Sequence, residues 1–323
     1  MILLIALGWG LLGTASKVLF AAEPAVFDGF TVAAARAAWS FPVFLVALIV
    51  VWRRERPRLE ARHWLGLVAA GLVFGVGITV LFSVAAQHTS VAHISFFLGM
   101  SPVTSTAAAA LVFRTGLSRR DWVALALGDF RLDGITAVIP GVGVTLLAVS
   151  HANDRAAFFG DALMVGWLIG FAIYGCALQY VGARVPPAMV IASVGTISMG
   201  SLLVFGLAMG WGGGIAHVAD TLSTGGWFFG EIVLGSTLIG QAAYAVAVRR
   251  MGVAVATIGA EYGALAVGVI ASLWLHERWT VLTVLAGLIF CSALAATFVP
   301  IPWLGPLTRS PSTPRPARED GAP

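Results

Sequence analysis

The stretch VAVATIGAEYGALAVGVIASLWL, Val253 to Leu275, decides the fold class of this chain. It carries one charged side chain, the carboxylate of Glu261, in an otherwise uncharged apolar run. At the α-helical rise of about 1.5 Å per residue, a run of this length crosses the hydrocarbon core of a bilayer, which is about 30 Å thick. The stretch is therefore predicted to be a membrane-spanning helix with a carboxylate inside it.

The composition of the whole chain agrees with a membrane protein. Of 323 residues, 59% are hydrophobic and 11% are charged, and the mean hydropathy is +0.93. A soluble domain carries about a quarter charged residues, so this chain has too little polar surface to face water. Cys176 and Cys291 lie inside apolar segments and offer neither a disulfide framework nor metal-ligand spacing. We expect no metal and no cofactor.

Apolar stretches bounded by charged or turn-forming residues predict ten membrane spans. The fifth is irregular, because Asp129, Arg131 and Asp133 precede it, and we predict either a broken helix or an insertion near 129–134. Residues 300–323 are rich in proline and serine and are predicted to form a disordered cytoplasmic tail. The predicted fold class is all-α, a polytopic membrane bundle of ten transmembrane helices at 1–20, 32–51, 64–86, 91–113, 135–150, 159–180, 187–211, 227–248, 253–275 and 280–299.

The distribution of arginine predicts the orientation of these spans. Fourteen arginines lie in the tail and in the loops after the second, fourth, sixth and eighth spans, whereas the opposite loops hold only Arg155 and Arg278. Positive residues concentrate on the cytoplasmic side of a membrane protein. We therefore expect a multi-pass protein of the cell inner (plasma) membrane with both termini in the cytoplasm. The same clustering of arginines between apolar spans argues against nucleic acid as a partner.

Two segments of the chain resemble each other at a nearly constant offset. Val91 corresponds to Val253 at an offset of 162 residues, and Gly116 corresponds to Glu277 at an offset of 161. Because five spans per half is an odd number, a second copy inserts upside down, as in many secondary transporters. We predict two inverted five-helix repeats, residues 1–150 and 151–299, with a substrate site between them. The alternative is that the likeness arises from composition alone.

Several short motifs, taken in order, resemble the ten-span EamA branch of the drug/metabolite transporter superfamily. The resemblance covers about residues 1–299 and implies a small-molecule carrier, commonly an exporter of amino acids or other metabolites. Gly116 departs from it, because the family usually has glutamate there, and so does the DFRLDG segment at 129–134; weak or lost activity is an alternative that both departures leave open. The motifs are Trp9-Gly10 followed by Lys17, Arg36 early in the second span, AAQHTSVAHISFFLGMSPV with Pro102, and VRRMGVAVATIGAEYGALAVGVIASLWLHERWT with Glu277.

Glu261 is the first candidate for a functional residue. It lies eight residues into its span, so it is about 12 Å from the cytoplasmic end of the helix. A charged group at such depth is costly unless it faces a cavity or a partner, and by default it marks a transport pathway. Glu261 is suited to take a proton or to hold a substrate ammonium group. The alternative is a protonated or hydrogen-bonded glutamate packed between helices.

Polar and aromatic residues on other spans complete the candidate site. Helix packing is the alternative role for them, and Lys17 and Arg36 have the further alternative of extending toward the outer interface. Arg36, Pro102 and Glu277 are assigned gating or structural roles, with a capping bond to the next helix expected for Glu277. The predicted substrate-binding residues are Glu261, Tyr262, Gln241, Tyr244, Trp9, Lys17, Trp167 and Tyr174.

Motifs for other classes of membrane protein are absent from the sequence. It contains no P-loop, no metalloprotease or hydrolase motif and no potassium-channel filter. We therefore predict that the chain is not an enzyme but a secondary transporter. It would move a small polar metabolite, an amino acid or similar, by alternating access, with export favoured and the proton as a candidate coupling ion. The alternatives are a membrane-embedded enzyme and a non-transporting lipid-handling or scaffold protein. Cargo, direction, coupling ion and oligomeric state stay open.

Overall fold

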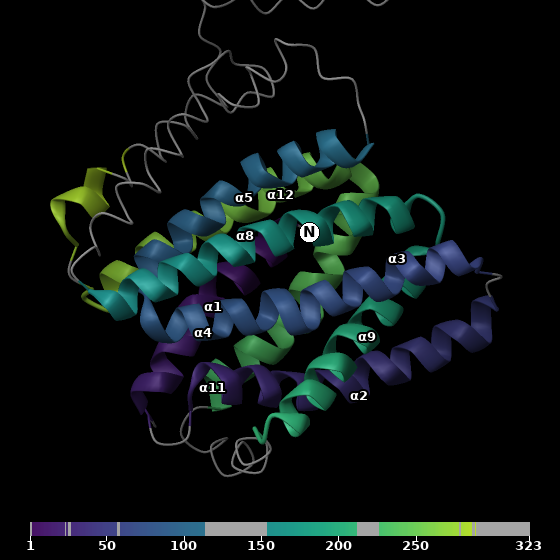
Figure 1. Ribbon diagram of the computed structural model, residues 1–323, viewed down its shortest axis with the longest axis horizontal. Coiled ribbons are helices and arrows are strands. Elements are labelled where there is room, and N and C mark those ends of the chain that lie inside the picture. Colours follow the sequence, from purple (N-terminus) through teal and green to yellow (C-terminus); the bar gives the residue numbers. More distant parts are fainter. Residues whose placement is uncertain are drawn as a thin grey trace, which may run out of the picture.

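The computed structural model describes residues 2–22, 24, 27–56, 59–113, 154–211, 226–277, 279–285 and 288. Within these ranges the elements are helices, and no strand occurs; Figure 1 shows them packed side by side as a bundle. The all-α prediction is therefore confirmed for this part of the chain. The elements are α1 (Ile2–Ala22), α2 (Gly29–Glu55), α3 (Ala61–Leu72), η1 (Val73–Thr79), α4 (Val80–His88), α5 (Val91–Phe113), α8 (Arg155–Gly182), α9 (Pro187–Ala208), α11 (Gly226–Gly230), η2 (Glu231–Gly240) and α12 (Gln241–Trp274).

Two of the long helices contain a π-helical segment. The segment η1 joins α3 to α4, so that one continuous helix runs from Ala61 to His88. In the same way, η2 joins α11 to the beginning of α12. Each π-helical segment therefore lies in the interior of a membrane-spanning helix.

The element α12 consists of two helices that meet at Gly252. This residue has φ 81° and ψ 160°, a conformation that glycine adopts without the steric cost that a Cβ would impose. Neighbouring side chains fix the joint, because Gln179 Oε1 accepts a hydrogen bond from Val253 N at 3.0 Å, and Arg249 Nη1 donates to Val185 O at 2.8 Å. The predicted boundary between the eighth and ninth spans therefore falls at a tight joint held by the end of α8.

The described helices agree with eight of the ten predicted spans. Six helices are long and apolar enough to cross a membrane, and two shorter apolar helices cover Val91–Pro102 and Gly263–Trp274. The predicted fifth span, the 129–134 segment, Gly116 and the tail lie outside the described residues, as does most of the tenth span. The total of ten spans and the two inverted repeats stay predictions.

Helices from the two halves of the chain pack against each other around α1. This helix contacts α12 and η2, and α5 contacts α12 and α8. The approach of α1 to η2 is close, because a Cβ built on Gly8 would lie 2.5 Å from the carbonyl oxygen of Gly235. Small residues at helix crossings allow such contacts in membranes. The interior of the bundle is thus formed by both halves of the chain.

Candidate functional site

A small cavity with a volume of about 30 Å³ lies inside the bundle, which is room for about one water molecule. Sites for small molecules fall in the range of about 300 to 1,000 Å³, so this cavity must widen to admit a solute. Residues of both halves of the chain line this central cavity, and most of them are aliphatic or aromatic. They are Trp9, Leu12, Arg36, Phe74, Ile78, Thr79, Phe82, Leu98, Trp167, Phe171 and Ser236.

Arg36 is the only charged residue among those described that line the central cavity. It projects from α2, and only 3% of its surface is exposed. Its Nε donates to Thr237 Oγ1, and its Nη2 donates to Ser236 Oγ at 3.3 Å. A guanidinium has five N–H donors, and within the described ranges these two hydroxyls are its only side-chain acceptors. Arg36 therefore retains donors for a solute in the cavity.

The π-helical segments form two walls of the central cavity. In η2, the hydroxyl of Thr237 donates to the carbonyl of Ile232, five residues earlier, at 2.7 Å. In η1, the hydroxyl of Thr79 donates to the carbonyl of Phe74, also five residues earlier, at 2.9 Å. Single turns of π-helix are rare and occur often at functional sites. Here they carry four residues of the cavity wall (Phe74, Ile78, Thr79 and Ser236) and the Thr237 hydroxyl that holds Arg36.

Five aromatic residues form a connected cluster beside Arg36. Trp167 stacks on Phe171 at a centroid distance of 4.9 Å, and Trp9 lies 5.5 Å from Phe171 and 4.9 Å from Tyr244. Tyr174 lies 6.1 Å from Tyr244. The structure thus brings together four residues of the predicted site, of which Trp9 and Trp167 line the central cavity. The fifth member, Phe171, was not among the predicted site residues.

Polar side chains lie on the far side of this aromatic cluster. Tyr244 shares a hydrogen bond of 2.9 Å with Thr257, within α12. Gln241 is 2% exposed and lies beside Tyr174. Neither the amide of Gln241 nor the hydroxyl of Tyr174 has a hydrogen-bond partner among the described residues. Gln241 and Tyr244, both predicted site residues, therefore lie beside or within the aromatic cluster.

Glu261 is completely buried but lines neither hollow described here. Its carboxylate faces Ser101 of α5 and interacts electrostatically with Tyr244. Neither carboxylate oxygen has a hydrogen bond to any of the described residues. Glu261 thus connects to the central cavity through Tyr244, whose ring packs on Trp9. The side chain of Tyr262 lies outside the described residues.

A second, larger hollow lies between α1, η2 and the end of α12, and we call it the lateral groove. Its volume is about 700 Å³, and Glu231 lines it together with exposed apolar residues such as Trp227 and Trp274. The carboxylate oxygens of Glu231 are buried and have no hydrogen-bond partner among the described residues. Glu231 interacts electrostatically with Arg36, and the contact between Gly8 and Gly235 lies in the wall that α1 and η2 form.

Glu231 was not among the predicted site residues. It lies near the beginning of the eighth predicted span, 227–248. The dipole of a helix favours an acidic side chain at this end, so such a residue does not by itself indicate a functional site. The sequence does show that Glu231 is an acidic side chain within an apolar run. It indicates how far Glu231 lies along its span, but it does not show that α1 packs beside it.

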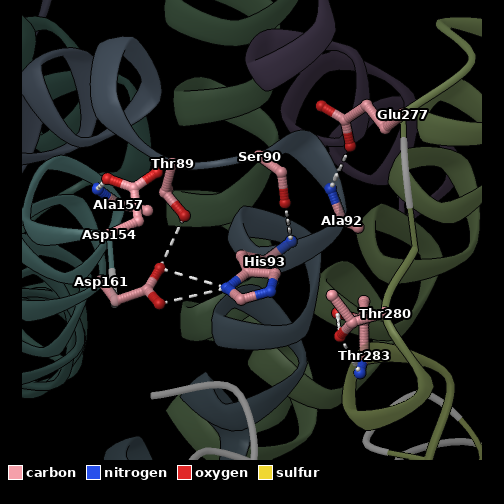
Figure 2. Close-up of polar contacts among 10 residues, drawn as sticks. All are labelled: Thr89, Ser90, Ala92, His93, Asp154, Ala157, Asp161, Glu277, Thr280 and Thr283. Atoms are coloured by element: carbon pink, nitrogen blue, oxygen red, sulfur yellow. Dashed lines mark hydrogen bonds and ion pairs between the residues drawn. The ribbon is translucent and has the colours of Figure 1, made fainter. Parts of the chain in front are cut away.

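Glu277 caps α5. Its Oε1 accepts a hydrogen bond from Val91 N at 2.8 Å, and its Oε2 accepts one from Ala92 N at 3.1 Å; Figure 2 shows the Ala92 contact. The expected capping bond to the helix that follows Glu277 is therefore corrected, because the side chain caps α5 instead. Lys17, half-buried on α1, interacts electrostatically with Glu277. Pro102 is buried inside α5.

A buried polar network lies close to Glu277, at the turn between α4 and α5 (Figure 2). Asp161 of α8 accepts a hydrogen bond of 2.6 Å from the hydroxyl of Thr89, and its Oδ2 lies 3.1 Å from Nδ1 of His93. His93 is 1% exposed and Asp161 is 3% exposed. This network was not predicted from the sequence, because His93 and Asp161 are far apart in the chain and neither belongs to a motif.

A known protein family matches part of the chain. The EamA-like transporter family matches residues 1–128, a range that includes Trp9, Lys17, Arg36 and Pro102. None of the curated proteins matches the chain. Together with the six long apolar helices found among the described residues, this match makes the chain a multi-pass membrane protein. The resemblance inferred from the sequence is confirmed over residues 1–128, where the chain matches the EamA-like transporter family.

Proposed function

We propose that this chain is a secondary transporter that moves a small polar metabolite across the inner membrane by alternating access. The observation that carries the proposal is the position of Arg36, a buried cation at the wall of a cavity formed by both halves of the chain. Charged groups inside a membrane-spanning bundle are costly, and they typically mark substrate or ion pathways. The match to the EamA-like transporter family supports the same function.

The two π-helical segments support a mechanism with two arrangements of the helices. Under the predicted inverted repeat, the third span corresponds to the eighth, and these are the helices that contain η1 and η2. Local departures from regular α-helix are typical of places where a helix bends or shifts. We infer that these segments adjust as the two halves rock about Arg36, and that they expose the central cavity to one side of the membrane at a time.

Glu261 is proposed as the ionisable group that couples transport to protons. Its carboxylate is buried without a hydrogen-bond partner among the described residues, and Tyr244 links it to the cavity wall. Protonation would remove its charge, and the hydroxyl of Ser101 is the polar group that faces it. A change in its charge would alter the packing of Tyr244 on Trp9. Export is the proposed direction.

An export screen tests the function directly. Cells that overexpress the chain are challenged with a panel of toxic metabolite analogues, and we expect tolerance to at least one of them. Arg36→Gln should reduce this transport by about 10- to 100-fold, because a hydrogen bond to a charged group contributes about 1.5 to 3 kcal/mol. Arg62→Gln, which changes an exposed arginine, is the control and should transport normally. Transport by Arg36→Gln at the rate of the unchanged protein would refute the assignment of the cargo site.

A second pair of variants tests whether open space is required. Ile78→Trp places a bulky ring in the central cavity, whereas Leu65→Trp places the same ring on a surface position that is 71% exposed. We expect Ile78→Trp to abolish tolerance and Leu65→Trp to preserve it, at equal levels of folded protein. A scaffold protein without a transport pathway would tolerate both changes.

A further inference from the structure

The wall of the central cavity carries charge of one sign only. Among its described lining residues Arg36 is cationic, Thr79 and Ser236 are neutral hydroxyls, and the remaining members are aliphatic or aromatic. The carboxylates of Glu231 and Glu261 do not line this space. A solute in the cavity therefore meets positive charge and apolar surface, but no acidic group of the described wall.

We propose that the cargo is an organic anion with a single carboxylate and a flat apolar body, and that zwitterions and cations are excluded. This inference rests on the transporter function proposed above. A guanidinium binds a carboxylate through two parallel N–H donors, which is stronger and more specific than a neutral hydrogen bond. Arg36 has already used Nε and one N–H of Nη2 on the hydroxyls of Thr237 and Ser236. Its remaining donors, on Nη1 and Nη2, are the ones that receive the carboxylate.

The aromatic wall sets the shape of the rest of the cargo. Trp167 and Phe171 stack with an interplanar angle of 12°, and Trp9 meets Phe171 edge to face at 83°. Aromatic faces and edges pack well against another ring and contribute about 0.5 to 1.5 kcal/mol beyond the burial of area. A planar body is thus favoured over a short polar chain.

An ammonium group has no acidic partner in the described wall of this cavity. The hydroxyls of Ser236 and Thr79 can accept hydrogen bonds, but they are neutral and do not balance the charge of an ammonium group. The guanidinium repels a second cation at short range in a low-dielectric interior. Glu231 interacts with Arg36 but lines the lateral groove, so its charge does not offer an acceptor inside the cavity.

Four probes with the same ring and different charge test this selectivity. Benzoate, benzamide, benzylammonium and phenylalanine are added to the purified full-length protein, and binding is measured by tryptophan fluorescence and thermal stabilisation. We expect benzoate to bind at least about tenfold more tightly than benzamide or phenylalanine, and benzylammonium not to bind. Competition of the other three probes with the entry of labelled benzoate into proteoliposomes should follow the same order as their binding. Equal or tighter binding of phenylalanine or benzylammonium would overturn the proposal.

Two variants separate the contribution of charge from that of shape. Arg36→Lys keeps a positive charge but lacks the planar pair of donors, so it should bind benzoate more weakly than the unchanged protein and more tightly than Arg36→Gln. Trp167→Leu should reduce the preference for benzoate over acetate, while a preference for anions over cations persists. If Arg36→Gln retained the preference for benzoate over benzamide, the assignment of the carboxylate site would fail.

The outcomes distinguish this inference from the proposed function. Suppose that the export screen shows transport and that Ile78→Trp abolishes it. If the transported solute is then a cation or a zwitterion, or if benzoate does not bind, the chain is a transporter and the anion inference is wrong. If no probe binds and Ile78→Trp has no effect in the screen, both proposals fail. Binding and entry of benzoate that depend on Arg36 support both.

Discussion

The turn between α4 and α5 and the central cavity both contain buried charge, but they treat it differently. At the turn, Asp161 has Thr89 and His93 beside it, and Glu277 accepts two backbone N–H groups. Around the cavity, the carboxylates of Glu231 and Glu261 have no hydrogen bond to any described residue. The first region uses its charges to hold helices in place.

The difference has an energetic basis. A buried ion that keeps its hydrogen bonds costs much less than one that has lost water without gaining partners. A structural network is therefore satisfied internally, whereas a site that binds and releases solutes or protons must leave groups free to receive them. The comparison predicts that changes at the turn reduce stability and that changes near the cavity reduce transport.

The largest loss of stability is expected for Asp161→Ala. Removing the buried carboxylate leaves His93 and the hydroxyl of Thr89 without this acceptor, so the free energy of unfolding should fall by about 3 kcal/mol. Arg62→Ala breaks the exposed ion pair with Glu60 and is the control, with an expected change within about 0.5 kcal/mol. Both are measured by unfolding in detergent. Similar losses for the two variants would contradict the structural role of Asp161.

A smaller loss is expected for Glu277→Gln. The amide still accepts one hydrogen bond but lacks the negative charge at the beginning of α5, so about 1 kcal/mol of stability should be lost. Asp154→Asn, which changes the N-cap residue of α8, is a matched control and should behave similarly. Transport per folded molecule should be unchanged in the same preparations. If Glu277→Gln instead blocked transport at full stability, Glu277 would act in gating.

The smallest effect on stability is expected for Glu261→Gln. The substitution keeps the shape of the side chain and removes a charge that has no hydrogen-bond partner among the described residues, so the melting temperature should stay the same or rise. Transport driven by a pH gradient in proteoliposomes should be lost. A melting temperature well below that of the unchanged protein would show that the carboxylate is held by a partner. Full coupled transport would refute its role in coupling.

The helices were predictable from the sequence because a bilayer constrains them strongly. Each span must be apolar over a fixed length, and this requirement is visible in the chain without any knowledge of packing. Trp9, Trp167, Tyr174 and Tyr244 were all predicted as substrate-binding residues, and the structure places them in one connected cluster. Their role in binding stays a prediction.

The relation between charges was not predictable in the same way. The sequence indicates the depth of a residue in its span but not its neighbours. Glu261 was therefore predicted as the main ionisable residue of the site, whereas in the structure Arg36 lines the central cavity and Glu261 does not. The contact between His93 and Asp161 depends on how α5 and α8 cross, and no local pattern encodes that crossing. The π-helical segments were missed as well, because an apolar run looks the same whether its hydrogen bonds span four residues or five.

The joint at Gly252 affects how a displacement of one helix is passed to the next. A single residue connects the helix that carries Tyr244 to the helix that carries Glu261, and Gln179 and Arg249 tie this joint to the end of α8. No loose loop is available there to absorb a displacement. Under the proposed mechanism, a tilt of one arm would be passed to the other, and the arrival of a solute would then be coupled to the loss of a proton from Glu261.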